Sequence, residues 1–181
     1  MKKISFIVLC CLLYLAAISQ NTLKLKDGWA MQCSLAGGIT GPEASQKGFN
    51  TAQWYKVSVP TTIIAGLLAN HVYDFDPFLD TNLSKIAGPQ FDTSWWFRKE
   101  FSLPAGQKGK NVIISMHGVN YKANIWLNGI LIADSNQAKG PFRFFEFDVT
   151  KLIHYSGANV LAVEVTRPFN PQRRGGDLAI D

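Results

Sequence analysis

The pattern of apolar and polar residues in the middle of the chain predicts a series of β-strands. Residues 95–101 alternate in character, which is typical of a strand with one buried face. Residues 111–119 are more continuously apolar, as expected of a strand covered on both sides. Asn128 and Gly129 then separate two further β-prone runs and form a strong hairpin signal, because both turn positions need positive φ angles. Strands joined by turns, without helices between them, predict an antiparallel sandwich.

Shorter patterns complete the predicted fold. Further strands are expected at residues 54–60, 142–149 and 158–166. One short helix is expected near residues 61–69, because four aliphatic residues share one face, a threonine can cap the start and Asn70 can end it. Residues 37–50 are rich in Gly, Ser and Pro and predict a surface loop. The long loop at 71–90 is expected to be ordered, because it is rich in aromatic residues and prolines.

Residues 1–19 are predicted to be a secretory signal peptide. Lys2 and Lys3 form a basic start, an apolar run follows over residues 4–17, and a small-x-small cleavage site ends at Ser19. The apolar run is too short for a comfortable membrane span. Cleavage would leave one domain, residues 20–181, with no membrane partner, in a secreted or periplasmic protein of a bacterium.

Composition favours a globular, β-rich domain. The chain contains 47% hydrophobic and 17% charged residues, which excludes the disordered class, and its 12 Phe and 5 Trp are typical of an aromatic-packed β-fold. Removal of Lys2 and Lys3 with the signal peptide would lower the net charge from +5 to +3, and because this excess is scattered and forms no basic stripe, no nucleic-acid partner is expected. Signal cleavage would leave Cys33 as the single cysteine, which excludes an intramolecular disulfide and favours a small buried residue.

Several conspicuous side chains are expected to be structural. At least one of Trp95 and Trp96 is expected in the core, and so is Trp126. His117 lies in a buried-looking strand and is expected to be a satisfied core or rim histidine. The two other histidines have no carboxylate or cysteine at metal-ligand spacing, so neither a metal site nor a cofactor is predicted.

Five motifs follow one another along the predicted strands: WWFRKEF at 95–101, HGV at 117–119, IWLNG at 125–129, FEFDVT at 145–150 and NVLAVEV at 159–165. Together they resemble the N-terminal sugar-binding domain of glycoside hydrolase family 2, and the resemblance runs from about residue 27 to the last residue. It implies an all-β, jelly-roll β-sandwich of the galactose-binding-domain-like type, in which Trp29 packs on the entering strand.

Further motifs favour one subfamily: VPTT at 59–62, YDFDPF at 73–78, TNL at 81–83 and GGDLAI at 175–180. They are most similar to those of the exo-β-D-glucosaminidases, which act on chitosan oligosaccharides, and the β-mannosidases resemble the chain next best. The resemblance therefore implies the N-terminal domain of a secreted retaining exo-glycosidase that hydrolyses terminal β-linked glucosamine. A β-mannosidase or another family 2 glycosidase is the alternative.

In that family this domain holds no catalytic residue. The resemblance implies two glutamates in a downstream (β/α)₈ barrel, an acid/base and a nucleophile that lie about 5–5.5 Å apart for retention. That barrel would be an intramolecular partner absent from this chain, which is expected to be truncated at its C-terminal end and to hydrolyse nothing alone. The resemblance also implies sugar contacts in two loops, by Asn82 with Asp80 beside it, and by Asp177.

Chemistry and spacing leave alternatives open at these residues. Aromatic rings stack on the C–H faces of pyranoses while Asp and Asn hold hydroxyl groups, and the loop at 71–90 contains both kinds. Asp80 and Asn82 are equally ordinary turn residues, and Asp177 follows two glycines as a turn acid does. The family motif also continues toward a further Asp past Asp181. A free-standing carbohydrate-binding module and a structural sandwich without a ligand are the other classes of function.

Overall fold

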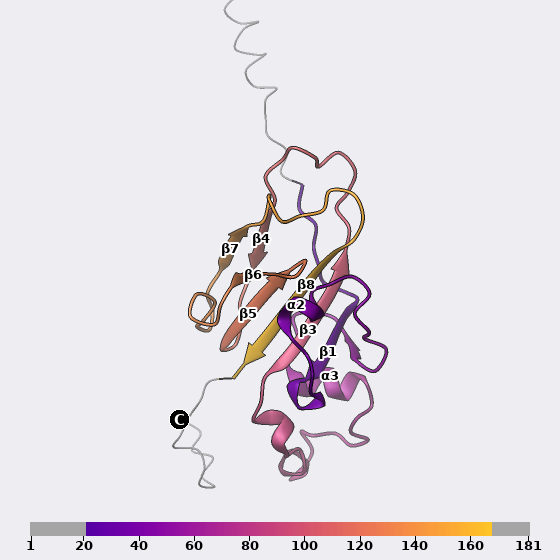
Figure 1. Cartoon of the computed structure of the whole chain (residues 1–181). Coiled ribbons are helices and arrows are strands. Elements are labelled where there is room, and N and C mark those ends of the chain that lie inside the picture. The colour runs from indigo at the N-terminus through magenta and orange to yellow at the C-terminus, as the bar shows by residue number, and fades with distance from the viewer. Residues whose placement is uncertain (1–20, 168–181) are drawn as a thin grey trace, which may run out of the picture.

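The computed structural model describes residues 21–167 and contains mostly strands (Figure 1). In chain order the elements are β1 (Trp29–Cys33), η1 (Ser34–Ala36), α2 (Gly41–Ala44), β2 (Tyr55–Val57), α3 (Ile63–Ala69), η2 (Asn82–Lys85), η3 (Pro89–Phe91), β3 (Trp95–Phe101), β4 (Ile113–Met116), β5 (Lys122–Leu127), β6 (Ile130–Ala133), β7 (Phe145–Asp148) and β8 (Asn159–Thr166). No helix among these residues has both the length and the apolar character needed to cross a membrane.

The strands form two antiparallel sheets. One sheet has six strands in the order β2-β1-β3-β8-β5-β6, and the other consists of β4 and β7. Every pairing in both sheets is antiparallel. This arrangement confirms the predicted all-β sandwich.

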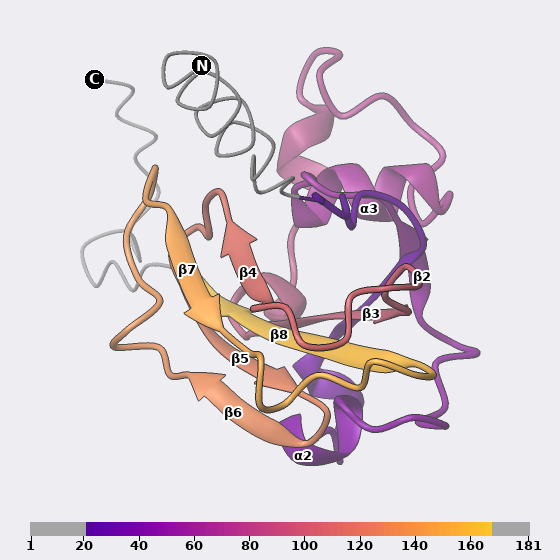
Figure 2. The same cartoon turned by 90° about the horizontal axis from the view of Figure 1, so that it is seen from above.

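The six-stranded sheet is covered on both faces (Figure 2). The β4–β7 sheet and α3 lie over one face, where the largest core cluster includes Met31, Trp95 and Ile125. The other face packs under α2, in a smaller cluster that includes Trp54 and Trp96. The molecule therefore has three layers, with the six-stranded sheet in the middle.

Burial along two strands differs from the prediction. The first four residues of β3 are all buried, because β3 is central in the covered sheet, so the expected single buried face is wrong there. Strand β4 alternates instead between exposed and half-buried residues, and Ile113 is 47% exposed. The two-stranded sheet is an outer layer with one free face, so the expectation that this strand is covered on both sides is also wrong.

Helix α2 lies within the stretch that was predicted to be a surface loop. A Cβ atom on Gly41 would lie 2.0 Å from Cε2 of Trp126, so the helix approaches the sheet closely only because this residue is glycine. Arg98 is buried and donates hydrogen bonds to the carbonyl oxygens of Ala44 and Gln46, each at 2.9 Å. The sheet therefore holds this segment through a buried guanidinium group.

The predicted hairpin turn and the predicted helix cap, which depend only on residues close together in the sequence, are both confirmed. Asn128 and Gly129 have φ angles of +51° and +89° and join β5 to β6 as predicted. The Thr62 side chain accepts a hydrogen bond from the Ala65 amide at 3.1 Å and caps α3, and the helix ends at Asn70.

The expected core tryptophans are largely confirmed. Trp95 and Trp96 are both buried, and the Trp96 ring centroid lies 5.4 Å from that of Trp126, which is half-buried. Cys33 is a free, buried cysteine, as predicted. His117 is exposed, so its expected place in a buried strand is wrong: β4 ends one residue before it.

Candidate functional site

The strand register gathers several chain segments at one end of the sandwich. Cys33 pairs with Trp95, Trp95 with Val165, and Val165 with Ala123, so these four residues form one row across the sheet. We call this the Trp95 end, which is the lower end in Figure 1. Loops 117–121 and 134–144 lie beside this row, since they bond through their backbones to β8 and β5. Loop 70–94 also lies beside it, since the amide of Ser34 donates to the carbonyl oxygen of Ser94, and the last described residue follows β8 directly. The opposite end carries the Asn128 turn and is called the Asn128 end.

Asn82 is fixed within the loop at the Trp95 end. Its Nδ2 donates a hydrogen bond to the carbonyl oxygen of Asp76 at 2.8 Å, and its Oδ1 accepts one from Lys85 Nζ at 2.6 Å. A side-chain amide has two N–H donors and two acceptor lone pairs. One N–H donor and one lone pair of Asn82 therefore remain for a ligand. Asn82 can hold the loop together and also make the predicted sugar contact.

Asp80 presents an exposed carboxylate on the same loop. Its φ angle is +51°, a left-handed conformation that Asp tolerates better than most residues. Phe78, two residues before it, is 84% exposed, and Leu79 and Leu83 are exposed as well. The loop therefore offers an exposed apolar ring and an exposed carboxylate close together in sequence, two kinds of group that can bind a pyranose.

Asp177, the third predicted contact, lies outside the described residues. The chain leading toward it leaves β8 at Arg167, whose guanidinium group forms an ion pair with Asp92 near the end of the 70–94 loop. The structure thus places the end of the 70–94 loop beside the start of the segment that contains Asp177, and both were predicted to contact sugar.

A second exposed aromatic group at this end was missed by sequence reasoning. Phe142 is 97% exposed, and Phe144 is 73% exposed with its ring edge-on to His117 at a centroid distance of 5.0 Å. Residues 142–149 were predicted to form one strand, but β7 begins only at Phe145. The Gly-Pro pair at 140–141 and the φ angle of +58° at Phe142 keep this part out of the sheet. The proline was the signal in the sequence that limited the strand.

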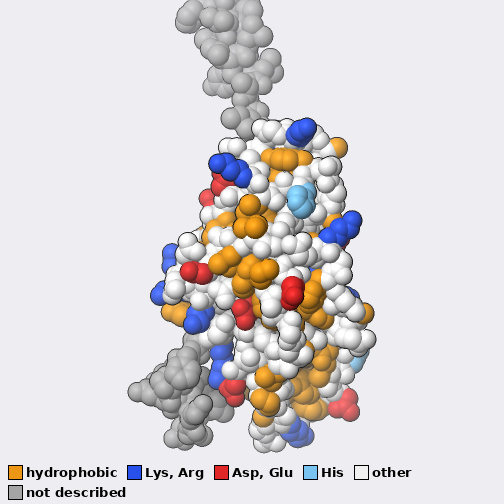
Figure 3. Space-filling model, viewed as in Figure 1, with side chains coloured by type: hydrophobic (Ala, Val, Ile, Leu, Met, Phe, Trp, Pro, Cys, Tyr) orange, Lys and Arg blue, Asp and Glu red, His pale blue; other side chains and the backbone are white. Residues whose placement is uncertain are grey.

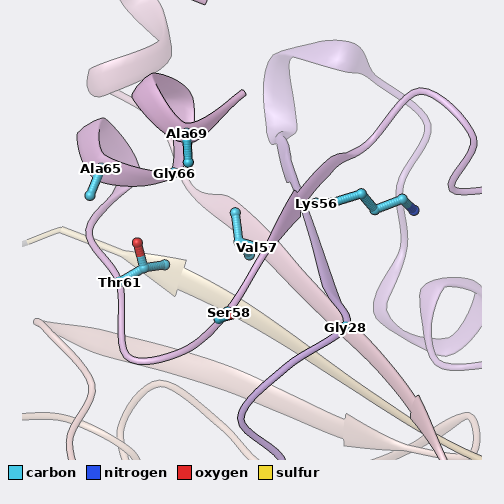
Figure 4. A pocket seen from close by; sticks show the side chains of 8 residues that line it. All are labelled: Gly28, Lys56, Val57, Ser58, Thr61, Ala65, Gly66 and Ala69. Carbon is cyan, nitrogen blue, oxygen red and sulfur yellow. The ribbon is translucent and has the colours of Figure 1, made fainter. Parts of the chain in front are cut away.

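Apolar side chains are also visible around α3 and the loop that follows it in Figure 3. A shallow depression of about 460 Å³ lies between β2 and α3, where Ala65 and Ala69 point toward it and the Lys56 side chain points away (Figure 4). None of the predicted site residues lines it.

Two properties of the ionisable side chains bear on their chemistry, their clustering and their pKa values. Within residues 21–167, no group of three His, Cys, Asp or Glu side chains is placed to hold a metal ion. Among the carboxyl groups of the described residues, only Asp148 has a clearly altered pKa, which hydrogen bonds from the Thr150 side chain and amide lower. Asp148 pairs with Ile113, at the far end of the β4–β7 ladder from Phe145, and so lies away from the Trp95 end.

Comparison with protein families identifies a match over most of the chain. A family model described as "Glycosyl hydrolase 2 galactose-binding domain-like" matches residues 43–176. An exo-β-D-glucosaminidase of Amycolatopsis orientalis is 35% identical over 129 residues, which cover 71% of this chain and 12% of that protein. A mannosylglycoprotein endo-β-mannosidase of Lilium longiflorum is 30% identical over 170 residues, which cover 86% of this chain and 17% of that protein.

Solved structures agree with the sequence comparison. The crystal structure of the Amycolatopsis orientalis exo-chitosanase CsxA superposes with a TM-score of 0.72 at 33% identity, covering 81% of this chain and 17% of that one. A β-D-mannosidase from Dictyoglomus thermophilum has a TM-score of 0.63 at 23% identity and shares the fold. The chain therefore spans less than one fifth of the length of each of these relatives.

Proposed function

Because the chain belongs to the glycosyl hydrolase 2 family through its galactose-binding domain-like sequence, we propose that it is the N-terminal sugar-binding domain of a longer, secreted exo-glycosidase. In this proposal the whole enzyme removes terminal β-linked glucosamine from chitosan oligosaccharides with retention of configuration. The observation that carries it is the 35% identity to an exo-β-D-glucosaminidase over 71% of the chain.

The domain's part in this reaction is to bind sugar rather than to break a bond. Two glutamates outside this chain would act as acid/base and nucleophile, as the retaining mechanism requires. Asp80 and the free N–H and lone pair of Asn82 would hold sugar hydroxyl groups, and Asp177 would add a carboxylate from the segment after β8. An exposed ring such as Phe78 would cover the C–H face of the pyranose.

The substrate is tested on the full polypeptide that the gene encodes. We expect kcat/KM on an aryl β-glucosaminide to exceed that on the matching β-mannoside by about tenfold or more, because an amino-sugar site leaves polar groups unpaired when the amine is absent. A preference for the mannoside would support the second candidate, a β-mannosidase, which the similarity to the Lilium longiflorum enzyme favours. No glycosidase activity, with sub-millimolar binding of chitosan oligomers by titration calorimetry, would instead support a free-standing carbohydrate-binding module.

The predicted sugar contacts are tested by two substitutions and one control. Asp80→Ala and Asn82→Ala should each lower kcat/KM by about tenfold, the effect of one lost hydrogen bond to a charged or polar group. Lys85→Met removes one of the two hydrogen bonds that hold Asn82 within the loop but no predicted sugar contact, so it should lower kcat/KM less than either substitution does. Equal losses in all three variants would mean that these residues shape the loop and do not touch sugar.

The proposed export is tested separately. The mature protein should begin at Gln20 when the gene is expressed in its own host, since cleavage is proposed after Ser19. Recovery of Met1 from the cell interior would contradict it.

A further inference from the structure

A polar network at the Trp95 end joins four elements through one carboxylate. Glu164 lies on β8 beside Trp96 of β3 and Asn124 of β5. Its Oε1 accepts a hydrogen bond from Ser94 Oγ at 2.7 Å, and its Oε2 accepts one from Asn124 Nδ2 at 3.1 Å. Glu164 is half-buried, and both of these donors are neutral. The family motifs and the predicted sugar contacts do not assign it a role.

The network extends outward on both sides of Glu164. Ser94 donates its proton to Glu164, so the 2.6 Å contact between Ser34 Oγ and Ser94 Oγ requires Ser34 to be the donor. The amide of Ser34 also donates to the carbonyl oxygen of Ser94 at 3.0 Å. On the other side, Asn124 Oδ1 accepts a hydrogen bond from the Ser135 amide at 2.8 Å. The carboxylate is thus the final acceptor for chains of donors from β5 (Asn124) and from residues that flank β1, β3 and β6 (Ser34, Ser94 and Ser135).

The donor Ser94 ends the loop that carries Asp80 and Asn82. Two further contacts hold the last residues of this loop, 90–94, which we call the loop root. Trp95 Nε1 donates to the carbonyl oxygen of Gln90 at 2.7 Å, and Arg167 forms its ion pair with Asp92. Ser94 is therefore bound to Glu164 of β8, and Asp92 is bound to Arg167, the residue that follows β8. In the sequence, Arg167 begins the segment that contains Asp177.

We propose that Glu164 is a positioning residue, which holds the end of the loop that carries Asp80 and Asn82 against β8. This inference rests on the proposed function. A charged acceptor suits the role, because hydrogen bonds to a carboxylate are shorter and about twice as strong as neutral ones. Its loss would loosen the root of the loop and weaken sugar binding, while the reacting groups elsewhere in the enzyme would be unchanged.

Two single substitutions that each break the contact between positions 164 and 124 can be combined in a double variant that restores it. A general loss of stability would not be reversed in this way. Glu164→Gln leaves one acceptor oxygen for two donors, so its N–H₂ group faces either the Asn124 N–H₂ group or the Ser94 hydroxyl, which then has to accept instead of donate. Asn124→Asp places a second carboxylate against Glu164. The double variant restores a donor–acceptor pair in the reverse direction, and position 124 still offers an oxygen to the Ser135 amide. Glu146→Gln, on the exposed face of β7, is the matched control for the loss of one negative charge.

These variants are compared in the full polypeptide on the aryl β-glucosaminide. We expect each single variant to raise KM about tenfold with kcat within about twofold of the unaltered enzyme, and the double variant to return KM to within about threefold. The Glu146→Gln control should match the unaltered enzyme. A lower melting temperature without a change in KM, or a double variant no better than the single ones, would overturn the positioning role.

A second measurement separates this inference from the proposed function. Hydrogen exchange of the Phe91 and Asp92 amides should be about tenfold faster in each single variant and should slow again in the double variant, because these amides form the turn at the loop root. This result is expected whether or not the polypeptide hydrolyses the substrate. An inactive unaltered enzyme would contradict the proposed function alone, whereas unchanged exchange at the loop root would overturn the role of Glu164.

Discussion

The two ends of the sandwich use their polar residues differently. At the Asn128 end, Asn128 Nδ2 donates to the Leu152 carbonyl oxygen and to Asn159 Oδ1, and its Oδ1 accepts from the Val160 amide, all within 2.9 Å. Asn159 is fully buried and exchanges two hydrogen bonds with the backbone of His154. At the Trp95 end, Phe78, Phe142 and Phe144 are largely exposed, and Asp80 presents its carboxylate to solvent.

This difference separates structural polar residues from candidates for function. A buried amide must have its hydrogen bonds satisfied within the protein, so the Asn128 end has little left to offer a ligand. Loops 102–111 and 152–158 lie at that end and carry no large exposed apolar residue, and the apolar residues exposed on its strands, Ile113, Ile130 and Leu131, are aliphatic and about half exposed. Exposed rings and an unburied carboxylate at the other end contribute little to the fold and are free for a sugar or a neighbouring domain. The predicted site therefore lies at the end that the fold leaves open.

Of the substitutions that test this contrast between the two ends, Asn159→Ala is expected to lower the free energy of unfolding most. The substitution removes the acceptor for His154 and Asn128 and leaves two donors unsatisfied, so the free energy of unfolding should fall by about 3 kcal/mol. Urea denaturation of the 181-residue chain measures the change. Asn111→Ala, at an exposed position, is the control and should change stability by less than about 0.5 kcal/mol. A loss at Asn159 as small as in the control would show that the Asn128 end is not held by this network.

A smaller effect is expected from Thr150→Val at the Asn128 end. Thr150 Oγ1 accepts a hydrogen bond from the Val112 amide at 2.9 Å, and its loss should cost about 1 kcal/mol. The same hydroxyl lowers the pKa of Asp148 below its ordinary value of 3.8, so the variant should have a higher pKa there. Carboxyl chemical shifts in an NMR titration measure that pKa.

The lowered pKa of Asp148 determines how the stabilising effect of Thr150 depends on pH. A carboxyl group with a lowered pKa in the folded state adds stability above its unfolded pKa and loses it as the pH falls through the folded value. The stability difference between the unaltered chain and Thr150→Val should therefore narrow as the pH falls below 3.8. An unchanged difference across that range would contradict the assigned hydrogen bond.

The smallest effect on stability is expected from Phe142→Asn at the Trp95 end. Asparagine tolerates the positive φ angle of this position, and the lost ring is almost fully exposed, so the free energy of unfolding should change by less than about 0.5 kcal/mol. Thermal unfolding of the 181-residue chain checks this. A loss of more than about 2 kcal/mol would mean that the Trp95 end is packed as closely as the other end, and the contrast would fail.

Sequence reasoning predicted those parts of the fold that depend on neighbours in the chain. The capped helix at Ile63–Ala69, the Asn128–Gly129 turn and strand β3 all follow from local patterns, and each is present. The family also follows from motifs along the strands, and the match over residues 43–176 confirms it. The candidate contacts Asp80 and Asn82 rest on the same resemblance and remain predictions.

Contacts between distant segments of the chain decided which strand faces are buried and which residues meet at the Trp95 end. Nothing local to β3 or β4 indicates that α2 covers the first and that the second is an outer layer. The three side-chain bonds of the Glu164 network join residues 40, 60 and 70 positions apart, and no pattern within one strand encodes them. Propensity and turn chemistry act over a few residues and can be read from the sequence. Which faces become covered and which polar groups meet depends on how the layers stack, because burial is a property of the assembled sheets.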